Sequence, residues 1–575
     1  MTIQHNLVLP VGRRTSPCMG LLMWLTTLLA TAALPGQHAW PIWMSSQVPD
    51  SGIPEPARVW RSHLAVAGAA VYAFWGVEDP ANPTLWSRSL DYGRTWSPMA
   101  PFRPGTVPVS GAFTRLIANG TDVLVHWVEG SATGSRSLLA VSSDRGTSWT
   151  VRPGPLSTEP NHLFDDGGTI LWSSGPWLFS STDRGASWQG PRPIGGPGTQ
   201  LAQVQSVRLH FAGGVLQAAW DELVGSATQA FYSRSTDLGV TWLPTARALA
   251  AASSWSQLAD FLVTPTATIL AWSDASGYYV DRSFDAGLSW LPAPSAVATL
   301  PAGEFPIFVS DGENVLAVWQ EPPIPGPYRV RCVRSPDHGR TWTAPPIDMF
   351  SLSLSGRYIG ISGLHSENGW VAVTVRHLNR SWLPQSLEYY RLVTRDGGVT
   401  WSGAGGAIEA ECQGVPFLAS NGTYLGGIWQ NELPLPYING YGNCLFDWFA
   451  GARPLGGGAA GTGGSTPALT IDKIPTYGFD SELQLRGGLP GAAAILSFGT
   501  LRSPIAVLGG QLRIDPVVNL FVTLDGPTGA MPGGVDHSFR VHFGVPADFC
   551  WQAFVLDPGA SGGVAMSEGI EVRVY

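Results

Sequence analysis

The stretch "RSLDYGRTWSP", residues 88–98, has a pattern of small, acidic and aromatic residues that returns six times further along the chain. Its form is S/T-x-D-x-G-x-S/T-W. The other copies are "VSSDRGTSWTV" (141–151), "SSTDRGASWQG" (180–190), "RSTDLGVTWLP" (234–244), "RSFDAGLSWLP" (282–292), "RSPDHGRTWTA" (334–344) and "VTRDGGVTWSG" (393–403). We call them the repeat turns, and their aspartates are Asp91, Asp144, Asp183, Asp237, Asp285, Asp337 and Asp396. Neighbouring aspartates lie 39 to 59 residues apart, so a unit of about 50 residues recurs.

Elementary turn chemistry explains the residue types in this motif. Asp fits turn geometry, and its carboxylate accepts hydrogen bonds from backbone N–H groups of the same turn. Gly supplies positive φ, the Ser and Thr hydroxyls close the turn from both sides, and Trp buries a large area between neighbouring sheets. None of these roles needs a substrate, so the motif predicts scaffold rather than a working site.

The residues around one copy predict four short antiparallel strands joined by hairpins. They are "AFTRLIANG" (112–120), "TDVLVHWVEG" (121–130), "RSLLAVSSD" (136–144) and, after the turn, "SWTVRPG" (148–154). Such a unit is one blade of a propeller. A period near 50 residues with strands in every unit therefore predicts an all-β propeller.

The motif resembles the Asp box, or bacterial neuraminidase repeat, of sialidase-like β-propellers, and the resemblance covers roughly residues 40–450. It implies that the repeat turns join the third and fourth strands of each blade, on the face away from the active site. Seven blades carry a motif, and the segments "VPFLASNG", "TYLGGIWQNE" and "GYGNCLFDWFA" supply an eighth without one. The N-terminal "AWPIWMSSQVPDSG" is expected to complete the last blade. Eight blades are the first choice, and seven or six remain open.

The two ends of the chain predict further parts. Residues 1–36 are expected to be a secretion signal, because two arginines precede the apolar run "MGLLMWLTTLLATAAL" and a small-x-small cleavage site. An uncleaved anchor is the alternative. The protein is therefore expected to be secreted, on the cell surface or periplasmic. After the propeller, residues 37–453, the composition predicts a Gly-rich linker at 454–467 and a small β-sandwich at 468–575.

The net charge and the cysteine spacing limit the classes of partner and cofactor that can be expected. The formal net charge is −9, which argues against nucleic acid and, after signal removal, against anionic membranes. None of the five cysteines stands in a C-x-x-C pair, so neither a metal site nor a cofactor is expected. Cys412 and Cys444 are the candidate disulfide pair. The expected partner is an extracellular glycan or protein, and the sequence leaves the oligomeric state undetermined.

A second pattern lies at the ends of the predicted second strands, where Trp is often followed by an acid. The segments are "FWGVED", "HWVEG", "AWDEL", "AWSDA", "VWQEP" and "IWQNE". If these ends ring one mouth of the propeller, their carboxylates can bind sugar hydroxyls, cations or a basic partner. The alternative, favoured for any single acid, is that each acid accepts a bond from its own loop while the Trp packs the blade. The predicted ligand-binding acids are Glu78, Glu129, Asp221, Asp274, Glu321 and Glu432.

The resemblance also implies candidate catalytic residues, because sialidases bind a carboxylate with three arginines and use a Tyr–Glu pair and an Asp acid/base. Arg61 stands in "VWRSHLAVAG", near the place of the family's R-I-P sequence but without Ile-Pro. The candidates by position are Arg61, Arg208 and Arg357 for the arginines, Asp79 for the acid/base, Glu222, and Tyr437.

Three functions are compatible with these patterns. The first is a secreted sialidase-like propeller that binds an extracellular glycan or protein. The second is an exo-glycosidase, of sialidase type or another kind, that acts on extracellular glycans. The third is a structural or adhesive protein of the cell surface. Converging arginines would favour a sialidase, and two facing carboxylates about 5–9 Å apart would favour another glycosidase.

Overall fold

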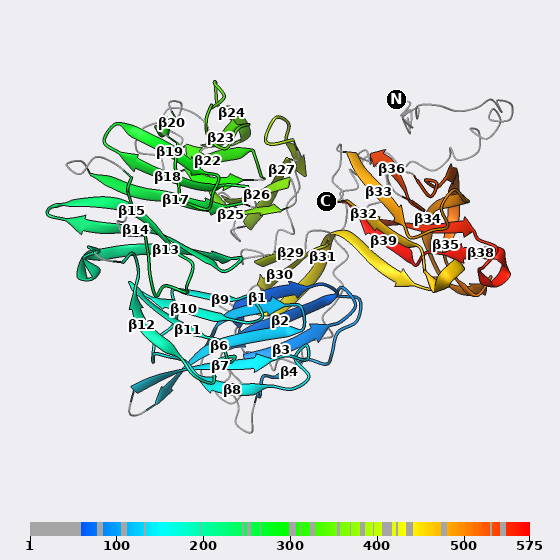
Figure 1. The fold of residues 1–575 in the computed structure, drawn as a ribbon, viewed down its shortest axis with the longest axis horizontal. Helices are drawn as coiled ribbons and strands as arrows, with labels where there is room; N and C mark the ends of the chain where they lie inside the picture. The colour runs from blue at the N-terminus through cyan, green and yellow to red at the C-terminus, as the bar shows by residue number, and fades with distance from the viewer. Residues whose placement is uncertain are drawn as a thin grey trace. The chain divides into compact units, whose positions relative to one another are not determined.

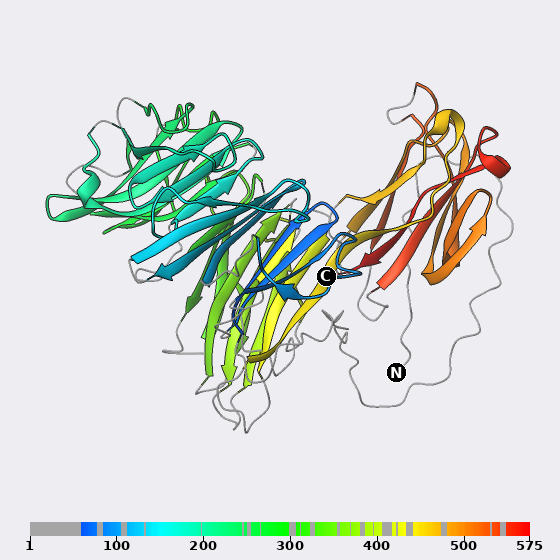
Figure 2. The ribbon, with the colours of Figure 1, turned by 90° about the horizontal axis from the view of Figure 1, so that it is seen from below.

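The structure is a computed structural model of an almost entirely β protein (Figures 1 and 2). It describes residues 59–77, 84–104, 112–131, 134–196, 198–243, 247–249, 255–264, 266–291, 293–297, 306–310, 312–321, 328–352, 357–367, 370–379, 386–394, 396–404, 417–420, 424–432, 441–472, 480–528, 532–540 and 548–574. The chain forms two compact units, with the division between Phe449 and Ala450. The described residues contain no helix with the length and hydropathy needed to span a bilayer.

The first unit contains seven four-stranded antiparallel sheets, which we number in chain order. In each sheet the strands are neighbours in the order in which they occur in the sequence. Sheet 1 contains β1 (Val59–Ala67), β2 (Ala70–Val77), β3 (Thr84–Ser89) and β4 (Ala100–Pro101), and sheet 2 contains β5 (Ala112–Asn119), β6 (Asp122–Ser131), β7 (Gly134–Ser142) and β8 (Thr150–Pro153). Sheet 3 contains β9 (His162–Asp165), β10 (Ile170–Ser174), β11 (Trp177–Ser181) and β12 (Gln189–Pro193). Sheet 4 contains β13 (Val204–Ala212), β14 (Val215–Val224), β15 (Ala227–Ser235) and β16 (Arg247–Ala248).

The remaining sheets of this unit continue the pattern. Sheet 5 contains β17 (Ser256–Val263), β18 (Thr268–Asp274), β19 (Gly277–Ser283) and β20 (Ser295–Ala296). Sheet 6 contains β21 (Ile307–Ser310), β22 (Val315–Glu321), β23 (Tyr328–Ser335) and β24 (Ile347–Leu352). Sheet 7 contains β25 (Arg357–Glu367), β26 (Trp370–Asn379), β27 (Ser386–Thr394) and β28 (Ser402–Ala404). Three further strands follow: β29 (Phe417–Ser420), β30 (Tyr424–Glu432) and β31 (Tyr441–Gly456).

The first strand of each sheet contacts the preceding sheet, in most cases at that sheet's own first strand, whereas β17 lies against β15 and β14. β1 lies against β5, β5 against β9, β9 against β13, β17 against β21 and β21 against β25. β1 also lies against β29 and β30, although more than three hundred residues separate them in the chain. The labels β1, β13, β17, β25 and β29 follow one another around this unit in Figure 1. The architecture is therefore propeller-like.

The core of this unit lies between successive sheets, because each second strand is buried on both faces. Tyr72 and Phe74 of β2 pack with Val123, Val125 and Trp127 of β6 in one apolar cluster. The pattern repeats around the unit, and the largest buried side chains stand at matching positions of the second strands. They include Trp75, Trp127, Trp172, Trp220, Trp272 and Trp319. These large aromatic side chains provide much of the apolar area that holds neighbouring sheets together.

Each repeat turn joins the third and fourth strands of its sheet and is closed by its own residues. In the turn of sheet 4, one carboxylate oxygen of Asp237 accepts hydrogen bonds from the Ser235 hydroxyl at 2.7 Å and the Thr241 N–H at 2.8 Å. The other accepts from the Thr241 hydroxyl at 2.6 Å. Leu238 adopts a φ of 59° and Gly239 a φ of 81°. All seven repeat turns bond in this way, through Asp91, Asp144, Asp183, Asp237, Asp285, Asp337 and Asp396.

The repeat turns also tie each sheet to its neighbour. The indole N–H of Trp242 donates to the Pro193 carbonyl of the preceding sheet at 3.0 Å. The Arg234 guanidinium donates to the Asp285 carbonyl in the next repeat turn at 3.2 Å. The arginine before the motif Ser is therefore a structural residue here.

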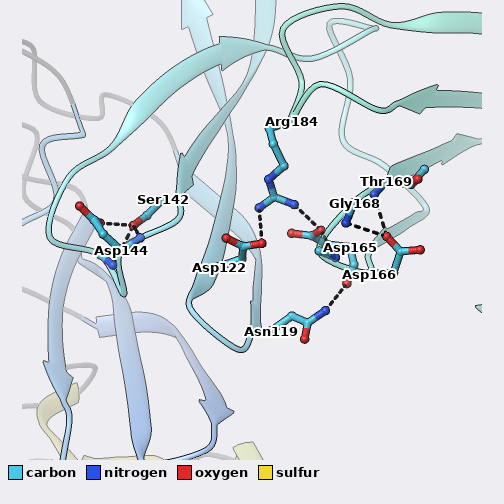
Figure 3. A network of polar contacts seen from close by, with 11 residues as sticks. Asn119, Asp122, Ser142, Asp144, Asp165, Asp166, Gly168, Thr169 and Arg184 are labelled. Carbon is cyan, nitrogen blue, oxygen red and sulfur yellow. Dashed lines mark hydrogen bonds and ion pairs between the residues drawn. The ribbon is translucent and has the colours of Figure 1, made fainter.

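Figure 3 shows a further contact between sheets 2 and 3. Arg184, in the repeat turn of sheet 3, forms ion pairs with Asp165 of β9 and, at 3.7 Å, with Asp122 of β6. Asn119 donates to the Asp165 carbonyl at 3.4 Å, and Asp166 accepts from N–H groups of its own hairpin. Asp122 and Asp165 are therefore already engaged in joining sheets 2 and 3.

The second unit contains two sheets around one core. The larger has the order β31, β39 (Gly569–Arg573), β37 (Asp548–Leu556), β34 (Ala493–Val507) and β35 (Gly510–Thr523), with β38 (Val564–Met566) paired to β37. The smaller contains β32 (Ala468–Ile471), β33 (Asp480–Arg486) and β36 (Val535–Arg540). Leu483 and Leu485 of the smaller sheet pack with Leu496, Trp551 and Val555 of the larger.

The Gly-rich segment 454–467 is not a freely extended linker in the structure. Its first residues belong to β31, and the short 3₁₀ helix η2 (Thr462–Gly464) follows. Ala459 pairs with Met566 in a β-bridge, and Asp557 accepts from the Thr462 N–H at 2.7 Å. Gly463 and Gly464 adopt positive φ, so the glycines of this segment form tight turns.

Several sequence predictions lie outside the described residues: the signal peptide at residues 1–36, the N-terminal strand proposed to complete the last blade, and Cys412 of the candidate disulfide. Cys332 and Cys550 are buried.

Candidate functional site

Three acids at the ends of the second strands, Glu129, Glu222 and Glu321, bond to the tryptophan two residues before them. Glu129 accepts from the Trp127 indole at 3.0 Å and from Arg136 at 2.7 Å. Glu222 accepts from the Trp220 indole at 3.1 Å and from the Gln200 N–H at 2.9 Å. Glu129 and Glu222 are almost completely buried. Both carboxylates are therefore engaged within their own sheets.

Glu321 repeats this arrangement in sheet 6, where it accepts from the Trp319 indole at 3.3 Å and from Arg331 at 2.9 Å. Asp274 accepts the N–H of Ser276 in its own hairpin at 2.7 Å. Glu321 and Asp274 therefore also accept hydrogen bonds from their own sheets.

Asp221 bonds instead to the neighbouring sheet. It accepts from the Ser206 hydroxyl and from the Leu258 N–H, both at 2.7 Å. Only 4% of Asp221 is exposed, and burial raises the pKa of its carboxyl despite these bonds. Asp221 thereby joins sheets 4 and 5.

Of the remaining predicted site residues, the structure describes either the backbone alone or neither backbone nor side chain. Arg61, Arg357 and Glu432 lie in β1, β25 and β30, and their side chains are not described. Glu78, Asp79 and Tyr437 lie outside the described residues. Of the predicted catalytic set, the side chains of Arg208 and Glu222 lie within the described residues.

Arg208 is the predicted catalytic residue whose surroundings are clearest. It lies in the middle of β13, and its guanidinium pairs with Asp260 of β17 at 2.6 Å. Asp260 also accepts from its own sheet, through the Phe261 N–H at 2.8 Å, and from sheet 6, through the Phe308 N–H at 3.1 Å. Asp260 thus holds Arg208 in place and joins three successive sheets.

Two first strands before β13 add a second arginine and a histidine. Arg115 of β5 forms an ion pair with Glu159 at 3.5 Å, and both side chains are about two-fifths exposed. His162 begins β9, between β5 and β13, and its ring contacts the Ser173 hydroxyl at 3.1 Å. We call Arg115, Glu159, His162, Arg208 and Asp260 the first-strand cluster.

The electrostatics of this cluster follow from its burial and its arginines. Burial lowers the pKa of His162, and the positive charges of Arg115 and Arg208 lower it further. His162 therefore carries no charge at neutral pH. Burial raises the pKa of the Asp260 carboxyl, although Arg208 and two backbone N–H groups oppose that rise.

The two arginines are held very differently. Asp260, which fixes Arg208, is mostly buried and accepts three donors. Glu159, which meets Arg115, is exposed, and the contact is long for a charged hydrogen bond. Exposed ion pairs of this kind contribute little, so an anionic ligand can replace Glu159 more readily than Asp260.

The sequence patterns predict Arg208 as a site residue but not Arg115, Glu159, His162 or Asp260. A signal was present for Arg115, because it stands in the first strand "AFTRLIANG". No such signal marks Asp260, which occurs inside "SQLADFLV" without a motif. In the described parts of the chain, no three His, Cys, Asp or Glu residues are grouped so that they could hold a metal ion.

No family model matches the chain, and no curated protein matches it. Solved structures that it resembles include carbohydrate-active enzymes with propeller-like folds. An ulvan lyase, described as a polysaccharide lyase of a new family, has a TM-score of 0.36 at 12% identity, over 58% of this chain and 93% of its own. A family 74 xyloglucanase from Xanthomonas campestris has a TM-score of 0.34 at 12% identity, over 88% of this chain and 80% of its own.

An endo-arabinase from Bacteroides thetaiotaomicron has a TM-score of 0.25 at 12% identity, over 43% of this chain and 94% of its own. Prolyl endopeptidases also occur among the matches. TM-scores this low establish neither a shared fold nor a shared activity, so the function has to be argued from the chain's own residues.

Proposed function

We propose that this chain is a secreted, sialidase-like propeller that binds an extracellular ligand, a glycan or a protein with an anionic group, at the first-strand cluster. The observation that carries the proposal is the pair of partly exposed guanidiniums, Arg115 and Arg208, on either side of the neutral His162. A guanidinium binds carboxylate, sulfate or phosphate oxygens through paired hydrogen bonds.

The acids of the second strands support binding over catalysis. Glu129, Glu222 and Glu321 already accept indole and other hydrogen bonds. A general acid or nucleophile must reach the substrate, whereas these carboxylates are engaged within their sheets. The arginines, in contrast, keep exposed surface for a ligand.

The proposal includes the finer features of the fold. We propose eight blades, with β29, β30 and β31 as the last, because β1 packs against both β29 and β30. We propose that the repeat turns are Asp boxes, and that the second unit is a β-sandwich, because its two sheets share one core. Secretion is proposed from the N-terminal apolar run and its preceding arginines.

The test is a binding screen of the full chain against arrays of neutral, carboxylated and sulfated glycans, with titration calorimetry of any ligand found. Arg115→Gln and Arg208→Gln should each weaken binding about tenfold or more, since a hydrogen bond to a charged group contributes about 1.5–3 kcal/mol. Arg340→Gln, at an exposed repeat-turn position, is the matched control. Binding that all three variants retain would refute the assignment of the site.

A second candidate function is an exo-glycosidase, and one observation favours it. Asp221 and Asp260 both have a raised pKa and both feel the charge of Arg208. A raised pKa is the property that a general acid needs. Turnover of fluorogenic sialosides, uronides or neutral glycosides that Asp260→Asn abolishes while ligand binding persists would favour this function.

A further inference from the structure

One ring nitrogen of His162, the histidine of the first-strand cluster, meets a buried hydroxyl. Its Nδ1 lies 3.1 Å from the hydroxyl oxygen of Ser173 on β10, and the same oxygen accepts the backbone N–H of His162 at 3.1 Å. Only 1% of Ser173 is exposed. Two groups of one residue therefore converge on a hydroxyl that water hardly reaches.

The hydrogen of this hydroxyl determines which ring nitrogen of His162 is protonated. A hydroxyl donates one hydrogen, and the backbone N–H already uses the Ser173 oxygen as its acceptor. Among the described residues, His162 Nδ1 is the acceptor that the Ser173 hydroxyl can reach. A buried O–H without an acceptor would be costly. The hydroxyl therefore donates to Nδ1, and the hydrogen of the neutral ring sits on Nε2.

A second contact fixes the plane of the ring. The His162 ring lies parallel to the ring of Phe164, with an interplanar angle of 3° and centroids 6.2 Å apart. Phe164 packs in turn against the apolar cluster that contains Leu209 and Trp220 of sheet 4. Nε2 lies across the ring from Nδ1, has no hydrogen-bond partner among the described residues and is not sealed from solvent. The fixed ring therefore presents an N–H donor to solvent.

The groups around the ring are also donors. Burial lowers the pKa of His162, and the charges of Arg115 on β5 and Arg208 on β13 lower it further. The two arginine side chains are each about two-fifths exposed, and the carboxylates of the cluster, Glu159 and Asp260, are paired with them. A guanidinium has N–H donors and no acceptor. An anion bound here thus meets donors from sheets 2, 3 and 4.

We propose that, in the anion binding proposed above, His162 donates its Nε2–H to an oxygen of the ligand, in a tautomer that Ser173 fixes. The ligand's anionic group is then an acceptor-only oxyanion, a carboxylate or a sulfate ester, whose oxygens carry no hydrogen at neutral pH. Each contact with Arg115, His162 and Arg208 pairs a donor with an acceptor. Ser173 is a positioning residue, because it acts through His162 and does not touch the ligand.

The first test reads the tautomer in the full chain with isotope-labelled histidine. Long-range proton–nitrogen NMR spectra distinguish a ring nitrogen that carries a hydrogen from one that does not, and the signals that disappear in His162→Gln identify His162. The wild type should carry the hydrogen on Nε2. Ser173→Ala should move part of the population to the other tautomer, because the donor to Nδ1 is gone. A wild type with the hydrogen on Nδ1 would overturn the proposal.

The second test replaces the ring by amides that keep one nitrogen each. The amide nitrogen of Gln reaches the place of Nε2, since both are three bonds from Cβ, whereas that of Asn reaches only the place of Nδ1. The probe is methyl sulfate, titrated calorimetrically. His162→Gln should stay within about threefold of the wild-type affinity, and His162→Asn should lose about tenfold or more, because a hydrogen bond to a charged group is missing. Equal affinities of the two variants would contradict the role of Nε2.

The third test addresses the ligand class with two probes of equal size and charge. At pH 5 methyl phosphate is mainly a monoanion with one O–H, because its second pKa is about 6, whereas methyl sulfate is a monoanion without one. That O–H would face donors at this site, so methyl sulfate should bind about tenfold more tightly. Equal binding of the two probes would exclude an acceptor-only ligand. Acetate, compared with methyl sulfate in the same way, shows which of the two oxyanions binds better.

Failure of this role of His162 can be told apart from failure of the proposed function. If Arg115→Gln and Arg208→Gln weaken binding of methyl sulfate while His162→Gln and His162→Asn lose equally, the role of His162 alone is overturned. If the wild type binds neither methyl sulfate nor acetate, both proposals fail. His338→Asn, at a repeat-turn position with a φ of 56°, is the matched control and should bind like the wild type. Circular dichroism checks the fold of every variant.

Discussion

Glu222 provides the sharpest test of whether the second-strand acids are scaffold or site. In Glu222→Ala two donors lose their acceptor: the Trp220 indole N–H and the Gln200 N–H. Trp220 is fully buried, and only 3% of Glu222 is exposed. Leaving a buried donor without an acceptor costs about 1–3 kcal/mol. Gln200 is exposed, so water can satisfy its N–H, and the loss falls on the buried indole; the variant should lose about 1–3 kcal/mol of unfolding free energy.

The matched control is Glu159→Ala. Glu159 is exposed and makes one long ion pair with Arg115. Since exposed ion pairs contribute about 0–1 kcal/mol, this variant should keep nearly its full stability. It should also bind an anionic ligand at least as well as the wild type, because one contact that competes for Arg115 is gone.

Urea unfolding followed by tryptophan fluorescence is the suitable assay. Only Trp551 of the 25 tryptophans lies in residues 450–575, so the signal reports mainly on the propeller-like unit. A Glu222→Ala variant that unfolds at the same urea concentration as Glu159→Ala would refute the scaffold argument. If that variant also lost ligand binding, Glu222 would belong to the binding site.

Three other predictions concern the repeat turns and the first-strand cluster. In Asp285, hydrogen bonds from the Ser289 hydroxyl and N–H and from Ser283 lower the pKa to about 2. Since this lies below the ordinary value of 3.8, the stability that the ionised carboxylate contributes is present above about pH 4 and is lost as the pH falls towards 2. Asp285→Asn should therefore have a lower Tm than the wild type at pH 7, and a difference that persisted near pH 2 would contradict this account. Gly287→Ala should lower the free energy of chemical unfolding by about 1–3 kcal/mol or more, because its φ is +85° and a Cβ there would lie 1.7 Å from the Tyr232 hydroxyl. The control Ala286→Gly, at a neighbouring residue with positive φ, should be neutral or stabilising. Equal effects of the two substitutions would disprove the steric argument. Arg115→Gln should raise the pKa of His162 towards its ordinary value, because one of the positive charges that lower it is removed. An NMR titration of the His162 ring measures this change. An unchanged pKa would show that Arg115 does not belong to the first-strand cluster.

Turn chemistry was readable from the sequence because it is local. The acceptors and donors that close each repeat turn come from residues within four positions of the Asp, as with Ser235, Asp237 and Thr241. The motif therefore contains nearly all the information needed to predict the turn. The bond from Trp220 to Glu222 is equally local, since the two residues are two apart on one strand.

The predicted candidate site was only partly readable, because a list of arginines and acids does not state which of them are already paired. Glu129 and Glu222 were candidates for a ligand-binding ring, and the structure places both in hydrogen bonds within their own sheets. Arg208 was chosen for its strand, but its partner Asp260 is 52 residues away and stands in no motif. Arg115 and Glu159 were missed for the same reason.

The sequence by itself determined the repeated turn, the strand content and the approximate length of one blade, since these depend on residues close together in the chain. Only the tertiary structure decided which side chains meet across sheets. Arg208 reaches Asp260, and His162 feels Arg115 and Arg208, because folding brings strands of successive sheets close together in space. The physical reason is that electrostatic and hydrogen-bond energies depend on distance in space, and packing between sheets sets that distance independently of separation along the chain.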